Sequence, residues 1–89
     1  MSYETVINEL IKVWVLFDPL ASSGQALFPI AIQWQRRLIK FERLIFASSK
    51  KIGEIKVINL VCASDSANFE LEYNSENHLW KLRKVMPKE

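Results

Sequence analysis

The amino-acid sequence predicts an all-β fold, in which six strands form an antiparallel meander that curls into a small barrel. Apolar and polar residues alternate with a period of two through most of the 89 residues, and this period is typical of half-buried strands. Short polar segments separate the alternating runs, as hairpin turns do. Closure into a barrel would hide the edges of the sheet. A chain of this length forms one domain, residues 1–89.

The first strand is expected at residues 10–17, because its Val-Trp-Val-Leu-Phe run is β-branched and aromatic. Apolar side chains in residues 3–14 also recur on one face of a 3.6-residue period, which would suit a helix. A short N-terminal helical turn over residues 3–9 is therefore an alternative, and the sequence leaves open whether residues 3–14 are helix or strand. Residues 18–26 follow as a loop that contains Pro, Ser and Gly.

Two further strands flank a tight turn in the middle of the chain. The second strand is expected at residues 29–34 and begins with a Pro, at a position where no ladder donor is needed. The turn follows at residues 35–37, and the third strand covers residues 39–46. Its alternation slips near Glu42, as a β-bulge would cause. Residues 48–53, which are rich in Ser and Lys, are expected to form the next turn.

The last three strands are expected at residues 54–62, 69–73 and 80–85. The first of these is apolar on both faces, which indicates burial on both sides or a central place in a curled sheet. Polar turns at residues 63–68 and 74–78 separate them. The phase of the alternation predicts a core that includes Trp34, Phe41, Phe69, Leu71 and Trp80.

The composition is that of an ordinary globular domain. Hydrophobic residues make up 49% and charged residues 25% of the sequence, which argues against disorder. No secretory signal is expected, because Glu4, Glu9 and Lys12 interrupt the first apolar stretch. The longest charge-free run, residues 19–35, contains two prolines and a glycine and is unsuited to crossing a membrane. The expected location is the cytoplasm.

The sequence offers no constellation for catalysis or metal binding. Cys62 and His78 are its only Cys and His, whereas a zinc site needs three or four ligands. A nucleophilic Ser or Cys needs a positioned base, and the Asn and Ser neighbours of His78 are typical of a turn. Gly24 and Gly53 do not form a phosphate-binding loop. We therefore expect a non-enzymatic binding module without catalytic residues, cofactor or metal.

Charge is segregated along the chain, although the net charge is only +2. Residues 36–56 carry seven Lys and Arg against two Glu. The candidate contacts to nucleic-acid phosphates are Arg36, Arg37, Lys40, Arg43, Lys81 and Arg83. The alternative is a solubilising surface, in which these cations pair with Glu54, Glu70 and Glu72. The pI of about 8.8 falls below that of strongly basic nucleic-acid-binding domains.

The apolar first strand is a second candidate surface. Trp14 shares a strand face with Lys12 and Leu16, so it is expected to be the most exposed Trp of the chain. Trp is enriched in the centres of protein interfaces, and the predicted interface residues are Trp14, Leu16 and Phe17. We expect a homodimer, a larger assembly or a protein partner at this strand. The first functional hypothesis is a protein–protein interaction or accessory module, and the second is a weak, sequence-tolerant nucleic-acid-binding module.

The spacing of several anchor residues resembles that of a known domain. These anchors are Phe28-Pro29, Trp34, Arg37, Phe41, Phe69-Glu70-Leu71-Glu72-Tyr73 and Trp80-Lys81-Leu82. In this order they resemble a small bacterial β-domain of unknown function, found stand-alone and at the C-terminal end of proteins similar to Y-family DNA polymerases. The resemblance spans about residues 12–85 and implies a compact β-domain with a link to DNA repair and no catalytic residues. The chain departs from this pattern at Arg36, where the hairpin is expected to carry Gly.

Overall fold

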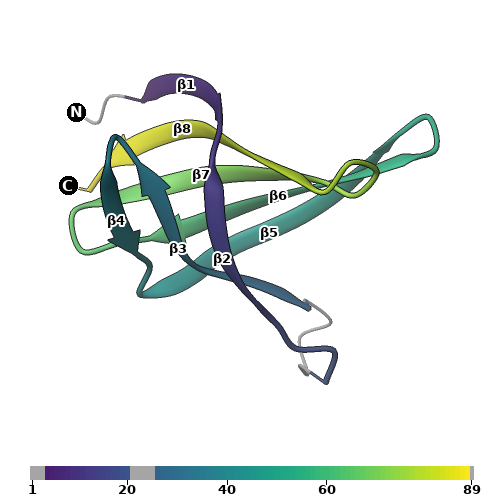
Figure 1. Cartoon of the computed structure of the whole chain (residues 1–89), viewed down its shortest axis with the longest axis horizontal. Coiled ribbons are helices and arrows are strands. Elements are labelled where there is room, and N and C mark those ends of the chain that lie inside the picture. The colour runs from purple at the N-terminus through teal and green to yellow at the C-terminus, as the bar shows by residue number, and fades with distance from the viewer. Residues whose placement is uncertain (1–3, 21–25, 89) are drawn as a thin grey trace.

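Residues 4–20 and 26–88 are described by the computed structural model, and strands dominate both stretches (Figure 1). The strands are β1 (Thr5–Leu10), β2 (Lys12–Phe17), β3 (Leu27–Trp34), β4 (Arg37–Lys40), β5 (Arg43–Ile52), β6 (Ile55–Ala63), β7 (Ala67–Asn74) and β8 (Leu79–Pro87). The prediction of an all-β fold is confirmed. Among these residues there is no helix long and apolar enough to span a membrane.

The strands form two antiparallel sheets. One has five strands in the order β1-β8-β7-β6-β5, and the other has three in the order β2-β3-β4. The three-stranded sheet lies across the long strands of the five-stranded sheet, and the two sheets share the core between them (Figure 1). Each sheet is built from consecutive hairpins, so most strand neighbours are also neighbours in sequence.

The prediction of six strands in a closed barrel is wrong, because two long strands break and change sheet. The chain passes from β1 to β2 at Ile11, whose N–H donates to the Trp80 carbonyl at 3.1 Å. It passes from β4 to β5 at Phe41 and Glu42, and the Glu42 N–H donates to the Ala63 carbonyl at 2.6 Å. Each break leaves one half of the strand in each sheet. The described residues therefore form eight strands in two sheets.

The N-terminal helical turn is also wrong for the described residues. Thr5 pairs with Val85 and Leu10 pairs with Lys81, so the segment from residue 5 onward is strand β1 at the edge of the five-stranded sheet. Residue 3 lies outside the described part of the chain. Pairing with β8 satisfies the backbone of this segment, and such tertiary pairing overrides a local helical period.

The turn expected at residues 48–53 is shorter than its composition indicates. Strand β5 continues to Ile52, which pairs with Ile55, and the turn consists of Gly53 and Glu54 alone. Gly53 has a φ of 63°, in the left-handed region where Gly carries no steric penalty. Ser48 to Lys51 are polar because they lie exposed on an edge strand, and not because they form a loop.

The core lies where the two sheets face each other. Its fully buried members are Ile32 from the three-stranded sheet and Leu60, Cys62, Leu71 and Leu82 from the five-stranded sheet, with Phe69 beside them. Burial of the predicted core residues Phe69 and Leu71 is confirmed. Trp34, Phe41 and Trp80 are half-buried and pack around this centre.

The β3–β4 hairpin has an unusual tight turn. Gln35 and Arg36 form the turn and have φ values of 52° and 62°. Two consecutive positive φ values define the type I′ turn, which normally carries Asn-Gly or a similar pair. The turn predicted at residues 35–37 is therefore present, and Arg36 adopts the conformation that Gly would favour. The turn reverses the chain so that β4 runs antiparallel to β3, and both positions with a positive φ carry a side chain.

We predict that the double substitution Gln35→Asn and Arg36→Gly stabilises the fold. A left-handed conformation costs most L-residues about 1–2 kcal/mol, and Asn and Gly avoid much of that cost. The free energy of unfolding should rise by about 1 kcal/mol in urea denaturation. Glu54→Gly is the control, because Glu54 is a turn residue whose φ is not positive. An equal gain in the control would contradict the turn assignment.

Candidate interaction surfaces

The three-stranded sheet exposes a group of large apolar side chains. They are Trp14 (41% exposed), Leu16 (55%), Phe17 (64%), Ile30 (49%) and Leu38 (55%), and we call them the apolar patch. Trp14 is more exposed than the half-buried Trp34 and Trp80, as its strand position predicts.

Strand register explains why Trp14, Leu16 and Leu38 face solvent. Val13 pairs with Ile32, and Ile32 pairs with Ile39, so these three side chains form the inner face against the core. Side chains alternate along a strand, so Trp14, Leu16 and Leu38 belong to the outer face, whereas Phe17 has the parity of Val13 and lies on the other face of the sheet. No described element covers that outer face, because the three-stranded sheet has the core on one side only.

Two members of the apolar patch were not predicted from the sequence. Leu38 directly follows the basic turn, and its pairing with Gln33 places it on the outer face. Leu38 lies two residues from Lys40 and so shares its strand face, whereas Ile39 lies on the other face. This spacing is the signal that would have identified Leu38. Ile30 is the extra residue of a β-bulge between the Trp14–Ala31 and Val15–Pro29 pairs. The sequence carries no local signal for that bulge.

The six candidate nucleic-acid contacts fall into separate regions. Arg36, Arg37 and Lys40 lie on the β3–β4 hairpin, and no ion pair joins any of them to a described residue. Lys81 and Arg83 lie on β8 in the other sheet.

The cations of β8 have acidic neighbours. Arg83 Nη1 lies 2.8 Å from Glu72 Oε1, and Lys81 pairs with Glu72 across the strands. Arg43, at the start of β5, borders a shallow hollow with Met86 and Lys88. These neighbours match the solubilising alternative for β8, whereas Arg36, Arg37 and Lys40 lie close together in sequence on the β3–β4 hairpin.

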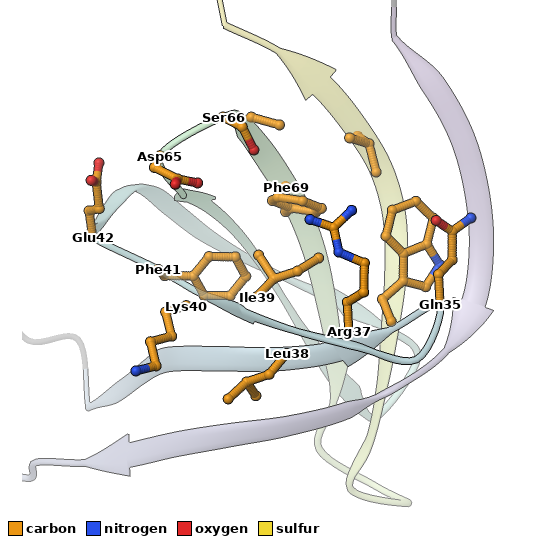
Figure 2. A pocket seen from close by; sticks show the side chains of 13 residues that line it. Gln35, Arg37, Leu38, Ile39, Lys40, Phe41, Glu42, Asp65, Ser66 and Phe69 are labelled. Carbon is orange, nitrogen blue, oxygen red and sulfur yellow. The ribbon is translucent and has the colours of Figure 1, made fainter.

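A hollow of about 580 Å³ opens between β4 and the β6–β7 turn. Figure 2 shows Arg37 and Phe41 on the side of β4 that faces Phe69, whereas Leu38 and Lys40 point away. The ring centres of Phe41 and Phe69 lie 5.7 Å apart and form part of an aromatic wall. The hollow thus combines this aromatic wall with charged side chains, among them Arg37, Glu42 and Asp65.

The single Cys and His lie in different settings. Cys62 is fully buried in the core, and burial raises the pKa of its thiol to about 12. His78 lies in the β7–β8 turn, where its Nδ1 is 2.7 Å from the hydroxyl of Tyr73. Within residues 4–20 and 26–88, no three His, Cys, Asp or Glu side chains gather in a way that could hold a metal ion.

Comparison with known proteins yields no match. No protein-family model, no curated protein and no solved structure matches this chain.

Proposed function

We propose that this protein is a non-enzymatic interaction module that binds protein through its apolar patch. The observation that carries the proposal is the exposure of five large apolar side chains on one small sheet. Burial of apolar surface contributes about 25 cal/mol per Å², so covering exposed side chains such as Trp14, Leu16 and Leu38 would favour association. On soluble proteins, large exposed apolar patches mark interaction sites.

The surroundings of the patch have the layout of an interface. Trp14 and Leu38 are apolar, and Lys12 and Lys40 lie on the same outer face at its margin. Protein interfaces commonly have an apolar centre, few charges within it and a polar rim. Trp is also the residue type most enriched among energetic hot spots. Trp14 is therefore the anchor of the proposed contact.

We predict that the chain self-associates to a dimer or larger assembly and that the patch carries this contact. Trp14→Glu and Leu16→Glu should each weaken association at least about 30-fold, the effect of losing a hot spot worth about 2 kcal/mol. Sedimentation velocity from low to high micromolar concentration measures it. Leu79→Glu is the matched control, because Leu79 is 46% exposed but lies on β8. A 10.4 kDa monomer at every concentration would contradict self-association.

A second candidate function is weak, sequence-tolerant binding of nucleic acid by the β3–β4 hairpin. It is supported by Arg36, Arg37 and Lys40, which lie on one hairpin and form no ion pair with the described residues. The resemblance to domains at the end of Y-family-polymerase-like proteins would make DNA repair its setting. Cations on a tight turn can contact successive phosphates without reading the bases.

We predict that binding of this kind is confined to low salt. Each neutralised phosphate on duplex DNA contributes a slope of about −0.9 to log K against log salt, so a few contacts fade at physiological salt. Fluorescence anisotropy with labelled single- and double-stranded oligonucleotides measures the slope. Arg36→Glu with Arg37→Glu should abolish binding, and Lys50→Glu with Lys51→Glu, on β5, is the control. Absence of binding at low salt, or equal effects of both pairs, would reject the hairpin as a site.

A further inference from the structure

Strand β2 is an edge strand whose free side carries a defined set of backbone groups. The N–H of Asp18 donates to the Ala26 carbonyl at 2.8 Å, so the backbone groups of even-numbered residues along β2 face β3. The groups of Val13, Val15 and Phe17 therefore face the other way. The Ile11 N–H, which has the same parity, donates to Trp80 on that other side. Strand β2 stands at the end of the order β2-β3-β4, so this edge has no strand partner in the described chain.

The segment from Lys12 to Asp18 is complementary to itself when it is reversed about Val15. We propose that β2 pairs antiparallel with β2 of a second copy of this chain, with the two Val15 residues opposite each other. The proposal deepens the proposed function and rests on it, because it names the partner and the geometry of the contact at the apolar patch. The paired sheets would form one continuous sheet with the order β4-β3-β2-β2-β3-β4.

This register pairs the backbone groups on the free edge. Val15 lies opposite Val15 of the second copy, and Val13 lies opposite Phe17 of the second copy. All of these residues direct their N–H and C=O groups outward, so each pair would exchange two hydrogen bonds. Unpaired backbone groups that become buried are costly, and this pairing leaves none of the three without a partner.

Neighbouring registers fit less well. Centring the pair on Trp14 would place Phe17 opposite Ile11, whose N–H is already bonded to Trp80. Centring it on Leu16 would place Val13 opposite Pro19, which has no N–H to donate. A register with an odd offset would place outward backbone groups opposite groups that already bond to β3.

The side chains in this register are matched as well. Trp14 would lie opposite Leu16 of the second copy, twice, in the closely spaced non-hydrogen-bonded positions where side chains interact most. Lys12 would lie opposite Asp18 of the second copy at both ends. Lys12 forms no ion pair with the described residues, and among those residues Asp18 accepts a hydrogen bond through Oδ1 from the Leu20 N–H at 3.0 Å. Opposite residues share a sheet face, so the two apolar patches would join.

The edge of β5 is less suited to such pairing. It carries Lys50 and Lys51 near its end, and both are exposed. Exposed lysines on an edge strand oppose pairing with another copy, because like charges would meet. Within β2, by contrast, the only charged residue is Lys12, and in the proposed register it meets a carboxylate.

Charge reversal in the full-length chain tests the register. Lys12→Asp should weaken the dimer about tenfold or more in sedimentation, because two Asp residues then face each other at each end, and Asp18→Lys should do the same. The double variant Lys12→Asp with Asp18→Lys should restore the dissociation constant to within about threefold of the parent. Lys51→Asp, on the exposed edge strand β5, should leave it unchanged. A double variant as weak as the single variants would overturn the register.

Cross-linking provides a test that does not depend on how Asp18 affects the adjoining loop. Val15→Cys should form a disulfide-linked dimer under mild oxidation, because residues opposite in a hydrogen-bonded pair have Cα atoms about 5.5 Å apart. Val13→Cys should not, since its counterpart is Phe17. Cys62 is buried, so the parent chain should form little disulfide-linked dimer and serves as the background control. If Leu38→Glu abolishes a dimer that neither cross-links at Val15 nor responds to charge reversal, the edge pairing is wrong and the proposed function stands. A monomer that does not cross-link would refute both.

Discussion

Leu71→Ala is expected to lower the free energy of unfolding by about 2–5 kcal/mol, the cost of removing a buried leucine and leaving a cavity. Leu71 is 0% exposed and lies opposite Leu60, which is also fully buried, in the middle of the five-stranded sheet. Buried side chains from three strands and from the facing sheet surround it, so the site has little freedom to collapse. Urea denaturation followed by Trp fluorescence measures the change.

Ile52→Ala is the control for this substitution. Ile52 is 57% exposed beside the β5–β6 turn, so its truncation should change stability by no more than about 0.5 kcal/mol. Leu60→Ala should behave like Leu71→Ala. A Leu71→Ala variant as stable as the parent would show that the core lies elsewhere.

Cys62 is expected to be inert in the folded protein. Burial raises the pKa of its thiol from 9.0 to about 12, so the reactive thiolate is about 1,000-fold scarcer at pH 8 than in the unfolded chain. Alkylation by iodoacetamide, followed by mass spectrometry, should be slower in buffer than in urea by at least about that factor. A variant with Cys62→Ala and Ser48→Cys places its thiol on the exposed edge strand β5. This thiol should react at similar rates in buffer and in urea. Equal rates for Cys62 folded and unfolded would contradict its burial.

The same shift sets the direction of a pH effect on stability. The folded thiol holds its proton up to about pH 12, whereas the unfolded thiol releases it near pH 9.0. The contribution of Cys62 to stability is therefore fully present below about pH 9 and is lost as the pH rises toward 12. Cys62→Val has no thiol to ionise, so its stability should fall less steeply over that range in denaturant titrations.

The all-β fold was predictable because alternation is a local property of the chain. The run at residues 69–73 lies within β7, and the run at residues 80–85 lies within β8. The positions where strands change sheet were not predictable. Ile11 carries no Gly or Pro beside it, and its break is set by a hydrogen bond to Trp80, which is distant in sequence. Such breaks depend on tertiary pairing, and a single-sequence pattern does not report it.

The candidate surfaces were predictable to a similar extent. Exposure of Trp14 and Leu16 follows from strand parity, whereas the exposure of Phe17, which has the parity of Val13, does not. The separation of Arg83 from Arg37 could not be predicted, because it depends on which sheet each strand joins. The sequence also could not show that one edge of β2 has no neighbouring strand among the described residues. Only once the sheet order is known does the reversed symmetry of Lys12 to Asp18 acquire a structural meaning.

Residue-resolved amide hydrogen exchange, measured by NMR at low and at high protein concentration, tests the proposed contact most directly. The amides of Trp14 and Leu16 bond to β3 and should be protected at both concentrations, whereas those of Val13, Val15 and Phe17 face the free edge. The second set should exchange fast in dilute solution and become protected as the concentration rises, with a midpoint that matches the dissociation constant from sedimentation. Exchange at Val13, Val15 and Phe17 that does not change with concentration would contradict pairing through β2.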